Sequence, residues 1–350
     1  MTEKFDILSC SEQEMAEYLT KAGQPTYRAK QVYKWLHCGV GFDEMTNLPK
    51  ALREYLKENA VIRTPSVEEK FVSKDGTVKY LLRLLDGELI EAVFMVYNHG
   101  NTICISSEAG CPMGCKFCAS TLKGLSRRLT PSEMLGQVLC VQNDTGKRIS
   151  NIVMMGIGEP LDNYDNTLKF LRLVSSENGL NIGLRHISVS TCGIVPAIDK
   201  LRCEDLGITL SISLHASDDE TRTSIMPVNK KYPIAQLLAS CKRYFEQTGR
   251  RISFEYTMIK GVNDTPHHAQ ALGDLLRRSM AGCPVHVNLI PVNTVKERAY
   301  VKSDEKTVQA FIDILAKKGI TATRRRSLGS DINASCGQLR YSKNSNFSEQ

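Results

Sequence analysis

The chain has no long apolar run and no export segment. Nothing in its 350 residues approaches the roughly 18 consecutive apolar residues that a membrane-spanning helix requires. The N-terminal stretch MTEKFDILSCSEQEM is polar and acidic, unlike the apolar core of a secretory signal or the Arg-rich pattern of a transit peptide. We therefore expect a cytoplasmic protein with no membrane partner.

Internal repeats, low-complexity tracts and long Gly/Ser linkers are also absent. Their absence argues against solenoid and linker-rich architectures. Hydrophobic residues make up 42% and charged residues 24% of the chain, which is typical of a folded soluble protein. The length predicts either about two domains or one large α/β barrel with additions.

Cysteine, by contrast, is abundant, with 12 in the chain. Without an export signal a disulfide framework is disfavoured, and metal ligation or thiol chemistry explains the cysteines better. The net charge of +7 permits an anionic partner but does not identify one. The cysteines therefore say more about function than the charge does.

The N-terminal part of the chain, residues 1–75, is expected to form a helical accessory domain. Tyr27–Leu36 carries apolar residues at helical spacing, and Leu48–Leu56 forms a second short helix that begins with a proline. Residues 76–99 are predicted to form a β-hairpin linker, because the turn signal Asp86-Gly87 separates two strand-like runs.

From about residue 100 the pattern changes to alternating strands and helices. The expected strands are Thr102–Ser106, Asn151–Met155, His186–Ser190, Ile208–Ser213, Ile252–Met258 and Val285–Leu289. The expected helices are Ser132–Gln142, Asn166–Ser176, Val195–Leu201, Ile234–Gln247, Pro266–Arg278 and Asp304–Lys317. The first helix opens at Thr130 with a capping box and with Pro131 at its first position.

Six such βα units predict an α/β fold with a parallel sheet, either doubly wound or curled toward a barrel. We assign them to residues 100–319. Residues 320–350 are expected to form a C-terminal extension with a basic strand and a loop that carries Cys336.

Three cysteines follow the first of these strands: Cys111, Cys115 and Cys118, at C-x₃-C-x₂-C spacing. A loop of this length can wrap three thiolates around a [4Fe–4S] cluster and leave one iron for an outside ligand. A structural zinc site is the alternative, but its usual signature is a pair of C-x₂-C knuckles, and no second knuckle is present. The spacing resembles that of the radical S-adenosylmethionine (SAM) superfamily.

The second strand is followed by the sequence Met-Gly-Ile-Gly-Glu-Pro at residues 155–160. Alone, its G-x-G is a weak motif that indicates a tight turn. Beside the cysteine loop it resembles the Gly-Glu-Pro segment that holds the SAM amino group in this superfamily. The Glu159 carboxylate is then expected to pair with that ammonium, while the glycines allow a close backbone approach.

Small polar residues also follow the third, fourth and sixth strands, in Ser190–Gly193, Ser213–Ala216 and Asn288–Asn293. Each segment alone is an ordinary loop start, and His215 alone would more often be structural. In a parallel α/β barrel, however, ligands bind at the carboxyl ends of the strands. We therefore expect one site assembled across this edge.

Together these motifs resemble the RlmN-type 23S rRNA (adenine-C2)-methyltransferases from about Tyr27 to Leu339. The segments that carry the resemblance are Tyr27–Trp35, Phe42–Leu48, the cysteine loop, Gly156–Leu161, Ile212–His215, Ile225–Asn229, Asn288–Pro291 and Ser335–Leu339. The resemblance implies a partial (β/α)₆ TIM-like barrel with an N-terminal helical accessory domain. The chain departs from the usual pattern at Ala119-Ser120 and at Cys192, and a free Cys192 near the site adds a risk of wrong disulfide pairing.

The resemblance also implies the reaction, which is methylation of carbon 2 of adenine 2503 in 23S rRNA and of adenine 37 in some tRNAs. One SAM methylates a cysteine, here Cys336 by motif. A second SAM, cleaved at the cluster, provides the radical that activates the S-methyl group for addition to the base. Cys104 matches the thiol that then attacks Cys336 and releases the product with a disulfide, and Glu91 matches the acceptor of the C2 proton.

By motif, SAM is expected to contact residues at several strand ends, namely Gly158, Glu159, Ser190, Ser213, Leu214, His215 and Asn293. The implied partners are 23S rRNA, tRNA and a reducing partner such as flavodoxin or ferredoxin. Basic segments are candidate phosphate contacts, namely Lys123, Arg127 and Arg128, Lys230 and Lys231, and Arg324–Arg326.

Two other functions stay open from the sequence. The related adenine-C8 methyltransferases that confer antibiotic resistance share the cluster, the paired cysteines and the barrel, although the intact Gly-Glu-Pro-Leu at residues 158–161 favours the C2 enzyme. A non-catalytic, zinc-stabilised RNA-binding protein is the alternative from another class. It would need neither Cys336 nor Glu159.

Overall fold

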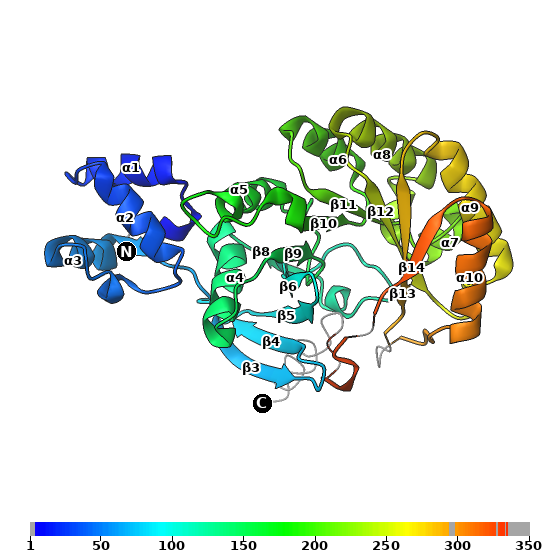
Figure 1. Ribbon diagram of the computed structural model, residues 1–350, viewed down its shortest axis with the longest axis horizontal. Coiled ribbons are helices and arrows are strands. Elements are labelled where there is room, and N and C mark those ends of the chain that lie inside the picture. Colours follow the sequence, from blue (N-terminus) through cyan, green and yellow to red (C-terminus); the bar gives the residue numbers. More distant parts are fainter. Residues whose placement is uncertain (1–3, 294–297, 327, 333, 335–350) are drawn as a thin grey trace.

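The computed structural model describes residues 4–293, 298–326, 328–332 and 334. The N-terminal helices lie at one end of an elongated molecule, and a large sheet with helices along it fills the rest (Figure 1). Among the described residues, no helix is long and apolar enough to cross a membrane.

A ten-stranded sheet forms the centre of the molecule, in the order β14-β13-β12-β11-β10-β9-β6-β5-β4-β3. Its parallel strands are β6 (Gly100–Cys104), β9 (Asn151–Met154), β10 (Ile187–Thr191), β11 (Thr209–Ser213), β12 (Ile252–Met258), β13 (Val285–Pro291) and β14 (Thr321–Arg324). The connecting helices are α4 (Pro131–Thr145), α5 (Tyr164–Ser175), α6 (Val195–Leu201), α7 (Asp219–Ile225), α8 (Ile234–Thr248), α9 (Pro266–Ser279) and α10 (Glu305–Lys317).

The six predicted βα units are confirmed, and the predicted basic strand becomes β14, which pairs with β13. The capping box at Thr130 is also confirmed, because the Thr130 side chain accepts from Glu133 N and the Glu133 side chain accepts from Thr130 N. Helix α7 was not predicted. It is short and polar, so the sequence offers little apolar periodicity to reveal it.

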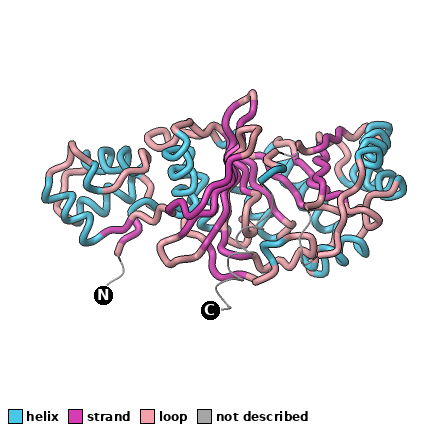
Figure 2. The backbone as a smooth tube through the Cα atoms, turned by 90° about the horizontal axis from the view of Figure 1, so that it is seen from below, coloured by secondary structure: helices cyan, strands magenta, loops and turns pink. Residues whose placement is uncertain are grey.

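The barrel is partial because the sheet continues past β6 instead of closing (Figure 2). Three antiparallel strands continue it, namely β5 (Leu89–Tyr97), β4 (Val78–Arg83) and β3 (Ser66–Val72). The hairpin around Asp86-Gly87 is confirmed, with Gly87 at φ +88° and Leu84 N donating to Glu88 O at 2.8 Å.

Strand β3 corrects the prediction that the whole N-terminal segment is helical. Residues 66–72 pair with β4 at the edge of the sheet, and most of them are exposed or half-buried. A partly solvated edge strand buries little apolar surface of its own, so its local pattern is weak. The strand forms because β4 supplies its hydrogen bonds.

The N-terminal domain is otherwise helical, as predicted. Its elements are β1 (Phe5–Asp6), α1 (Glu12–Lys21), α2 (Tyr27–Leu36), α3 (Lys50–Asn59) and β2 (Ala60–Val61). Polar contacts join the domain to the barrel, since Ser132 Oγ donates to Asp6 Oδ2 at 2.8 Å and Ser132 N to Ser9 Oγ at 3.0 Å. Both bonds lie at the start of α4, so they fix the domain against the first helix of the barrel.

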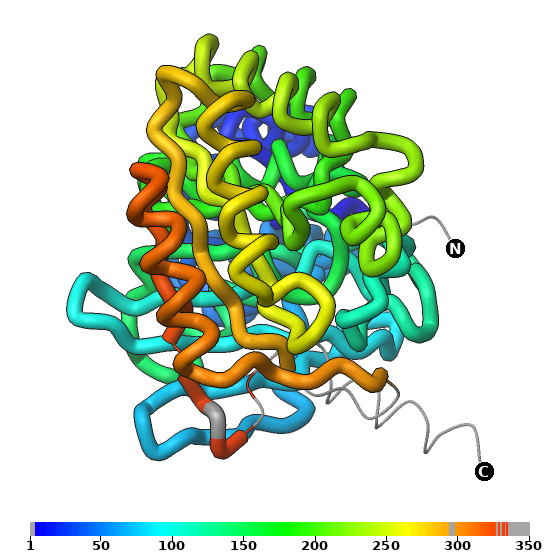
Figure 3. Tube along the Cα trace, turned by 90° about the vertical axis from the view of Figure 1, so that its right-hand side faces the viewer, coloured from blue at the N-terminus to red at the C-terminus, as the bar shows by residue number. Residues whose placement is uncertain are grey.

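The C-terminal elements α10 and β14 lie at the edge of the sheet opposite β3 (Figure 3). Most apolar side chains of the parallel strands are buried, and they join one core with the helices that cover the sheet. Burial of a large apolar side chain contributes about 1.5–3 kcal/mol. This core is what holds the polar loops at the strand ends in place.

Candidate active site

A cavity of about 180 Å³ opens at the carboxyl ends of the parallel strands. Its walls come from the cysteine loop and from the ends of β9, β10, β11, β12 and β13. The residues used below that line it are Cys111, Cys115, Phe117, Cys118, Gly158, Glu159, Ser190, Thr191, Cys192, Ser213, His215, Glu255, Asn293 and Arg325. The single site expected across this edge is therefore present.

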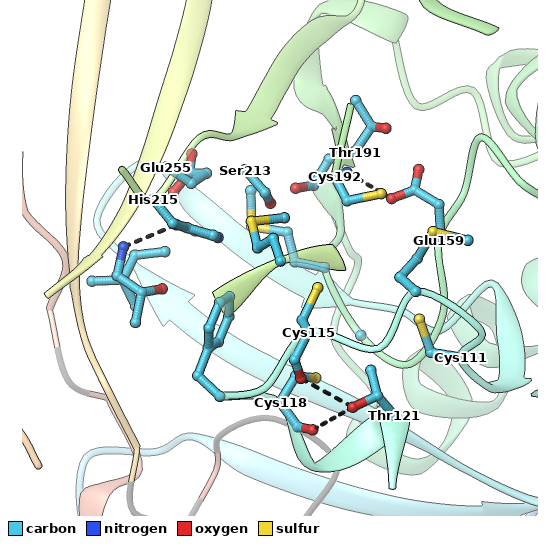
Figure 4. A pocket seen from close by; sticks show the side chains of 18 of the residues that line it. Cys111, Cys115, Cys118, Thr121, Glu159, Thr191, Cys192, Ser213, His215 and Glu255 are labelled. Atoms are coloured by element: carbon cyan, nitrogen blue, oxygen red, sulfur yellow. Dashed lines mark hydrogen bonds between the residues drawn. The ribbon is translucent and has the colours of Figure 1, made fainter. Parts of the chain in front are cut away.

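The three thiols of the cysteine loop face this cavity (Figure 4). The loop is tied to its surroundings by backbone bonds, from Cys111 N to Gly124 O at 3.0 Å and from Lys116 N to Ile225 O at 2.9 Å. Thr121 Oγ1 donates to the carbonyls of both Cys115 and Cys118 at 3.0 Å. The fold thus presents three thiols on a braced loop.

The arrangement of these thiols fits an iron–sulfur cluster. Burial raises the pKa of Cys115 to about 12, and burial also raises the pKa of Cys111, so the metal has to displace their protons when it binds. Among the described residues, no three His, Cys, Asp or Glu side chains are placed to hold one metal ion. Three thiols that line one cavity at C-x₃-C-x₂-C spacing match the ligand set of a [4Fe–4S] cluster with one open iron.

The loop after β9 requires its glycines. Gly158 has φ +106°, and a Cβ added there would lie 2.6 Å from the Cβ of Glu108. A Cβ on Gly156 would lie 2.6 Å from Ile105 O. The loop therefore presses against the chain that leads into the cysteine loop, which only residues without side chains permit.

Glu159 lies at the end of this loop and is only 4% exposed. Its Oε1 accepts from Leu161 N at 3.0 Å and its Oε2 from Cys192 N at 2.7 Å. Burial raises the pKa of its carboxyl, and these backbone bonds act in the opposite direction. The carboxylate is held in a fixed orientation beside the thiols, with lone pairs left for an ammonium.

Sequence reasoning missed a second buried carboxyl, that of Glu108. Its Oε2 accepts from Glu159 N at 2.8 Å, and its Oε1 has no hydrogen-bond partner among the described residues. Burial raises its pKa to about 8, and the nearby carboxylates of Asp162 and Glu159 add to the shift. Glu108 is therefore largely protonated near neutral pH and supports the Gly158–Glu159 backbone from behind.

His215 also lines the cavity, and its backbone is strained at φ +58°. Its Nδ1 accepts from Thr257 N at 2.9 Å, and the Phe117 ring meets it edge-on. Burial, followed by the charge of Arg222, lowers the pKa of the imidazole to about 3. The ring is therefore neutral and carries its proton on Nε2.

Glu255 and Arg325 are cavity residues that the sequence analysis did not single out. Glu255 sits on β12 and accepts from Asn288 Nδ2 at 2.7 Å, and burial raises its pKa. An acid among the apolar residues Ile252, Phe254, Tyr256 and Met258 was the available signal. Arg325 follows β14, in one of the basic segments.

The remaining predicted residues are placed differently. Leu214 is buried but is not among the residues that line the cavity, and neither are Glu91 of β5 and Cys104 of β6. Cys336 lies outside the described residues. No disulfide joins any two of the 11 cysteines that the structure describes.

Comparison with known proteins identifies this architecture. The sequence model of the radical SAM superfamily matches residues 105–271, and that of the ribosomal RNA large subunit methyltransferase N-terminal domain matches residues 5–62. A probable dual-specificity RNA methyltransferase RlmN from Alkaliphilus oremlandii is 54% identical, over 97% of this chain and 98% of that protein. The chain belongs to the RlmN family.

Two further relatives agree with this assignment. The protein of the same name from Clostridium acetobutylicum is 53% identical over 96% of both chains. The crystal structure of a radical SAM methyltransferase from Sphaerobacter thermophilus superposes with a TM-score of 0.91 and 41% identity, covering 95% of this chain and 98% of that one. As a radical SAM enzyme, this RlmN-family chain uses a [4Fe–4S] cluster and SAM.

Protein purified without oxygen should be brown and contain about four irons per chain. Replacing Cys111, Cys115 or Cys118 by Ala should abolish the colour, because each removes one of only three thiolates. Cys38→Ala, on the surface, and Cys241→Ala, in the core, are the matched controls and should keep their iron. Colourless, folded wild-type protein with one zinc would contradict the cluster.

Glu108→Gln should stabilise the protein as pH rises. The pKa of Glu108 is about 8 in the native state, against an ordinary value of 4.5. Burial of this group therefore costs no stability through ionisation below pH 4.5, and the native state loses stability as the pH rises toward 8. The loss is at most about 1.4 kcal/mol per pH unit, and Gln removes it. Melting temperatures from pH 5 to 9, with surface Glu246→Gln as control, check this. Parallel curves for wild type and Glu108→Gln would refute the raised pKa.

Proposed function

We propose that this chain methylates carbon 2 of adenine in 23S rRNA and in tRNA, with Cys336 as the carrier of the methyl group. The observation that carries the proposal is the single cavity that joins three cluster thiols to a fixed carboxylate, in a chain whose N-terminal domain matches a ribosomal RNA methyltransferase domain. The relatives named dual-specificity RNA methyltransferases support both RNA substrates.

The roles of Glu91 and Cys104 are supported by the register of β5 and β6. Cys104 pairs directly with Val93, so side chains at these two positions share one face of the sheet. Glu91 lies two residues from Val93 and therefore shares that face. The two residues assigned to the end of the reaction are thus diagonal neighbours.

Glu91 also has a buried counter-charge. Lys79 Nζ lies 3.4 Å from Glu91 Oε1, and the two side chains are 2% and 6% exposed. The carboxylate of Glu91 is the group that would accept a proton, and Lys79 holds it in place. Glu91 O in turn accepts from Ser106 Oγ, which accepts from Ile157 N in the SAM loop. Glu91 is therefore tied to the loop that we assign to SAM.

The segment that leads to Cys336 is anchored beside the same strands. Ser73 Oγ donates to Asp331 Oδ1 at 2.5 Å, and Gly329 N donates to Asp75 Oδ2 at 2.9 Å. The turn between β3 and β4 therefore holds the chain just before the Cys336 loop.

In the proposed reaction, Glu159 binds the amino group of SAM and neutral His215 provides an Nε2 donor. The bound cluster and SAM supply the radical that activates the methyl group on Cys336. The carbon radical on Cys336 then adds to carbon 2, and the adduct loses the C2 proton to Glu91 and one electron, for which the oxidised cluster would be the acceptor. The Cys104 thiolate attacks the Cys336 sulfur, so an S–S bond forms, the bond from sulfur to the transferred carbon breaks, and that carbon is protonated to give the new methyl group.

RNA and an electron donor complete the proposal. Lys230 and Lys231 are exposed next to α7 and are candidates for phosphate contacts. Arg127 and Arg128 are less suited, since Arg127 pairs with Glu133 and Arg128 with Asp162. A flavodoxin or ferredoxin is proposed as the reductant of the cluster. After each turnover, the Cys104–Cys336 disulfide would also have to be reduced.

Glu159→Gln should weaken SAM binding about tenfold to a hundredfold, because a charge-assisted bond contributes about 1.5–3 kcal/mol. The amide also offers one acceptor where the carboxylate serves two backbone N–H groups. Equilibrium dialysis at full iron content measures the effect, with exposed Glu58→Gln as control. Unchanged affinity for SAM would remove Glu159 from the binding site.

Cys104→Ala should trap RNA on the protein. Addition joins Cys336 to the base before release, so without Cys104 the cycle stops at a covalent adduct that survives denaturation. Cys336→Ala should form no adduct, and half-buried Cys140→Ala should turn over normally. A denaturing gel and the mass of the peptide with residue 336 provide the readouts.

The product should contain 2-methyladenosine. Comparison of digested RNA with 2-methyl and 8-methyl standards by mass spectrometry separates the C2 activity from the C8 alternative. Wild-type protein that never carries a methyl group on Cys336, together with normal turnover by Cys104→Ala, would overturn the proposed mechanism. The cluster assignment would survive that result.

A further inference from the structure

Arg222 of α7 is the largest fully buried side chain among the described residues, with 0% exposure. Arginine is almost never fully buried unless it is paired with an opposite charge or fully hydrogen-bonded. Taking a charge out of water is expensive. A buried guanidinium next to the cavity therefore needs an explanation.

The hydrogen-bond partners of Arg222 are all neutral oxygens. They are Leu214 O at 3.0 Å, Ser213 O at 3.1 Å, Cys192 O at 2.7 Å, Asn229 Oδ1 at 2.9 Å and Tyr232 O at 3.4 Å. No described carboxylate forms an ion pair with it. The nearest acid on its own helix, Asp219, accepts instead from Asn229 Nδ2 and Ile234 N. The positive charge is thus held in place without being neutralised.

Arg222 is connected through one residue to Glu159, the carboxylate that we assign to SAM binding. Cys192 O accepts from Arg222 Nη2, and Cys192 N donates to Glu159 Oε2, both at 2.7 Å. Ser213, whose carbonyl Arg222 also binds, lines the cavity. The guanidinium therefore ties together the loops after β10 and β11.

Arg222 also lies against the cysteine loop. The last residue of its helix, Ile225, accepts a backbone bond from Lys116, which follows Cys115 directly. The guanidinium is close enough to Cys115 to oppose, by its charge, the raised pKa of that thiol. A cluster held by three thiolates is anionic, and reduction adds one more negative charge.

We propose that Arg222 is a positioning residue for the cofactor site, whose charge, in no ion pair with a described carboxylate, favours reduction of the cluster while its hydrogen bonds hold the SAM-binding loops. A purely structural clamp gains nothing from a charge, because desolvation makes a cation costlier than a neutral donor. The inference rests on the cluster and SAM assignments of the proposed function.

Two variants of the holoenzyme separate charge from hydrogen bonding. Arg222→Gln removes the charge, and Arg222→Lys keeps it but loses the five-contact geometry. Arg243→Gln is the matched control, since Arg243 is exposed and paired with Asp199. Iron content and circular dichroism establish loading and folding. A redox titration followed by electron paramagnetic resonance gives the cluster potential, and dialysis gives the SAM affinity.

Arg222→Gln should make one-electron reduction at least tenfold less favourable, a shift of about 59 mV to more negative potential. Arg222→Lys should change the equilibrium constant for cluster reduction by less than threefold and should bind SAM more weakly. Arg243→Gln should match wild type in both the potential and the SAM affinity. A folded Arg222→Gln variant with four irons and an unchanged potential overturns the proposal.

If Arg222→Gln does not fold, Arg222→Lys decides. A loaded Lys variant with the wild-type potential and weaker SAM binding supports the proposal, and a Lys variant with a tenfold shift in the reduction equilibrium overturns it. Wild-type protein without iron would instead contradict the proposed function. The two failures are therefore distinguishable.

Discussion

Opposite charges at the strand ends are kept apart by backbone. Glu159 and Arg222 do not form an ion pair but bind the N–H and the C=O of the same residue, Cys192. A direct pair would satisfy both groups and leave little charge for anything else. Backbone groups of Cys192 instead hold both side chains, so that the carboxylate stays available for the ammonium and the guanidinium for the anionic cluster that we propose. The geometry of the site depends on this separation, and the loops after β9, β10 and β11 follow from it.

Such a site requires strained and closely packed backbone. Gly158 passes so close to Glu108 that no side chain fits, and His215 occupies the left-handed region without being a glycine. Strain of this kind costs of order 1–3 kcal/mol per residue. Buried apolar side chains of β11 and β12 offset it, among them Leu210, Ile212, Phe254 and Met258. The core is therefore what allows a polar, strained edge to persist.

Much of this could be predicted from the sequence, because the deciding signals were local. The βα units follow from periodicity, the start of α4 from its capping box, and the cluster thiols from their spacing. What the sequence did not reveal depends on burial by distant segments. Glu108 and Arg222 resemble solvated charges in their local sequence, and only the folded chain shows that both are enclosed. Strand β3 likewise depends on its hydrogen bonds with β4.

The antiparallel strands beyond the barrel position the residues that we assign to the end of the reaction. They place Glu91 and Cys104 on one face of the sheet, and the β3–β4 turn holds the chain before Cys336. The cavity lies on the parallel part of the sheet, whereas these residues lie on and beside β6, its last parallel strand. Ser106 joins the two parts by binding both Glu91 O and Ile157 N. A sheet that closed into a barrel after β6 would leave no edge for β5, and with it no position for Glu91. The open barrel is thus a condition for the proposed chemistry, because it gives β5 its place in the sheet and Glu91 its hydrogen-bonded link to the loop assigned to SAM.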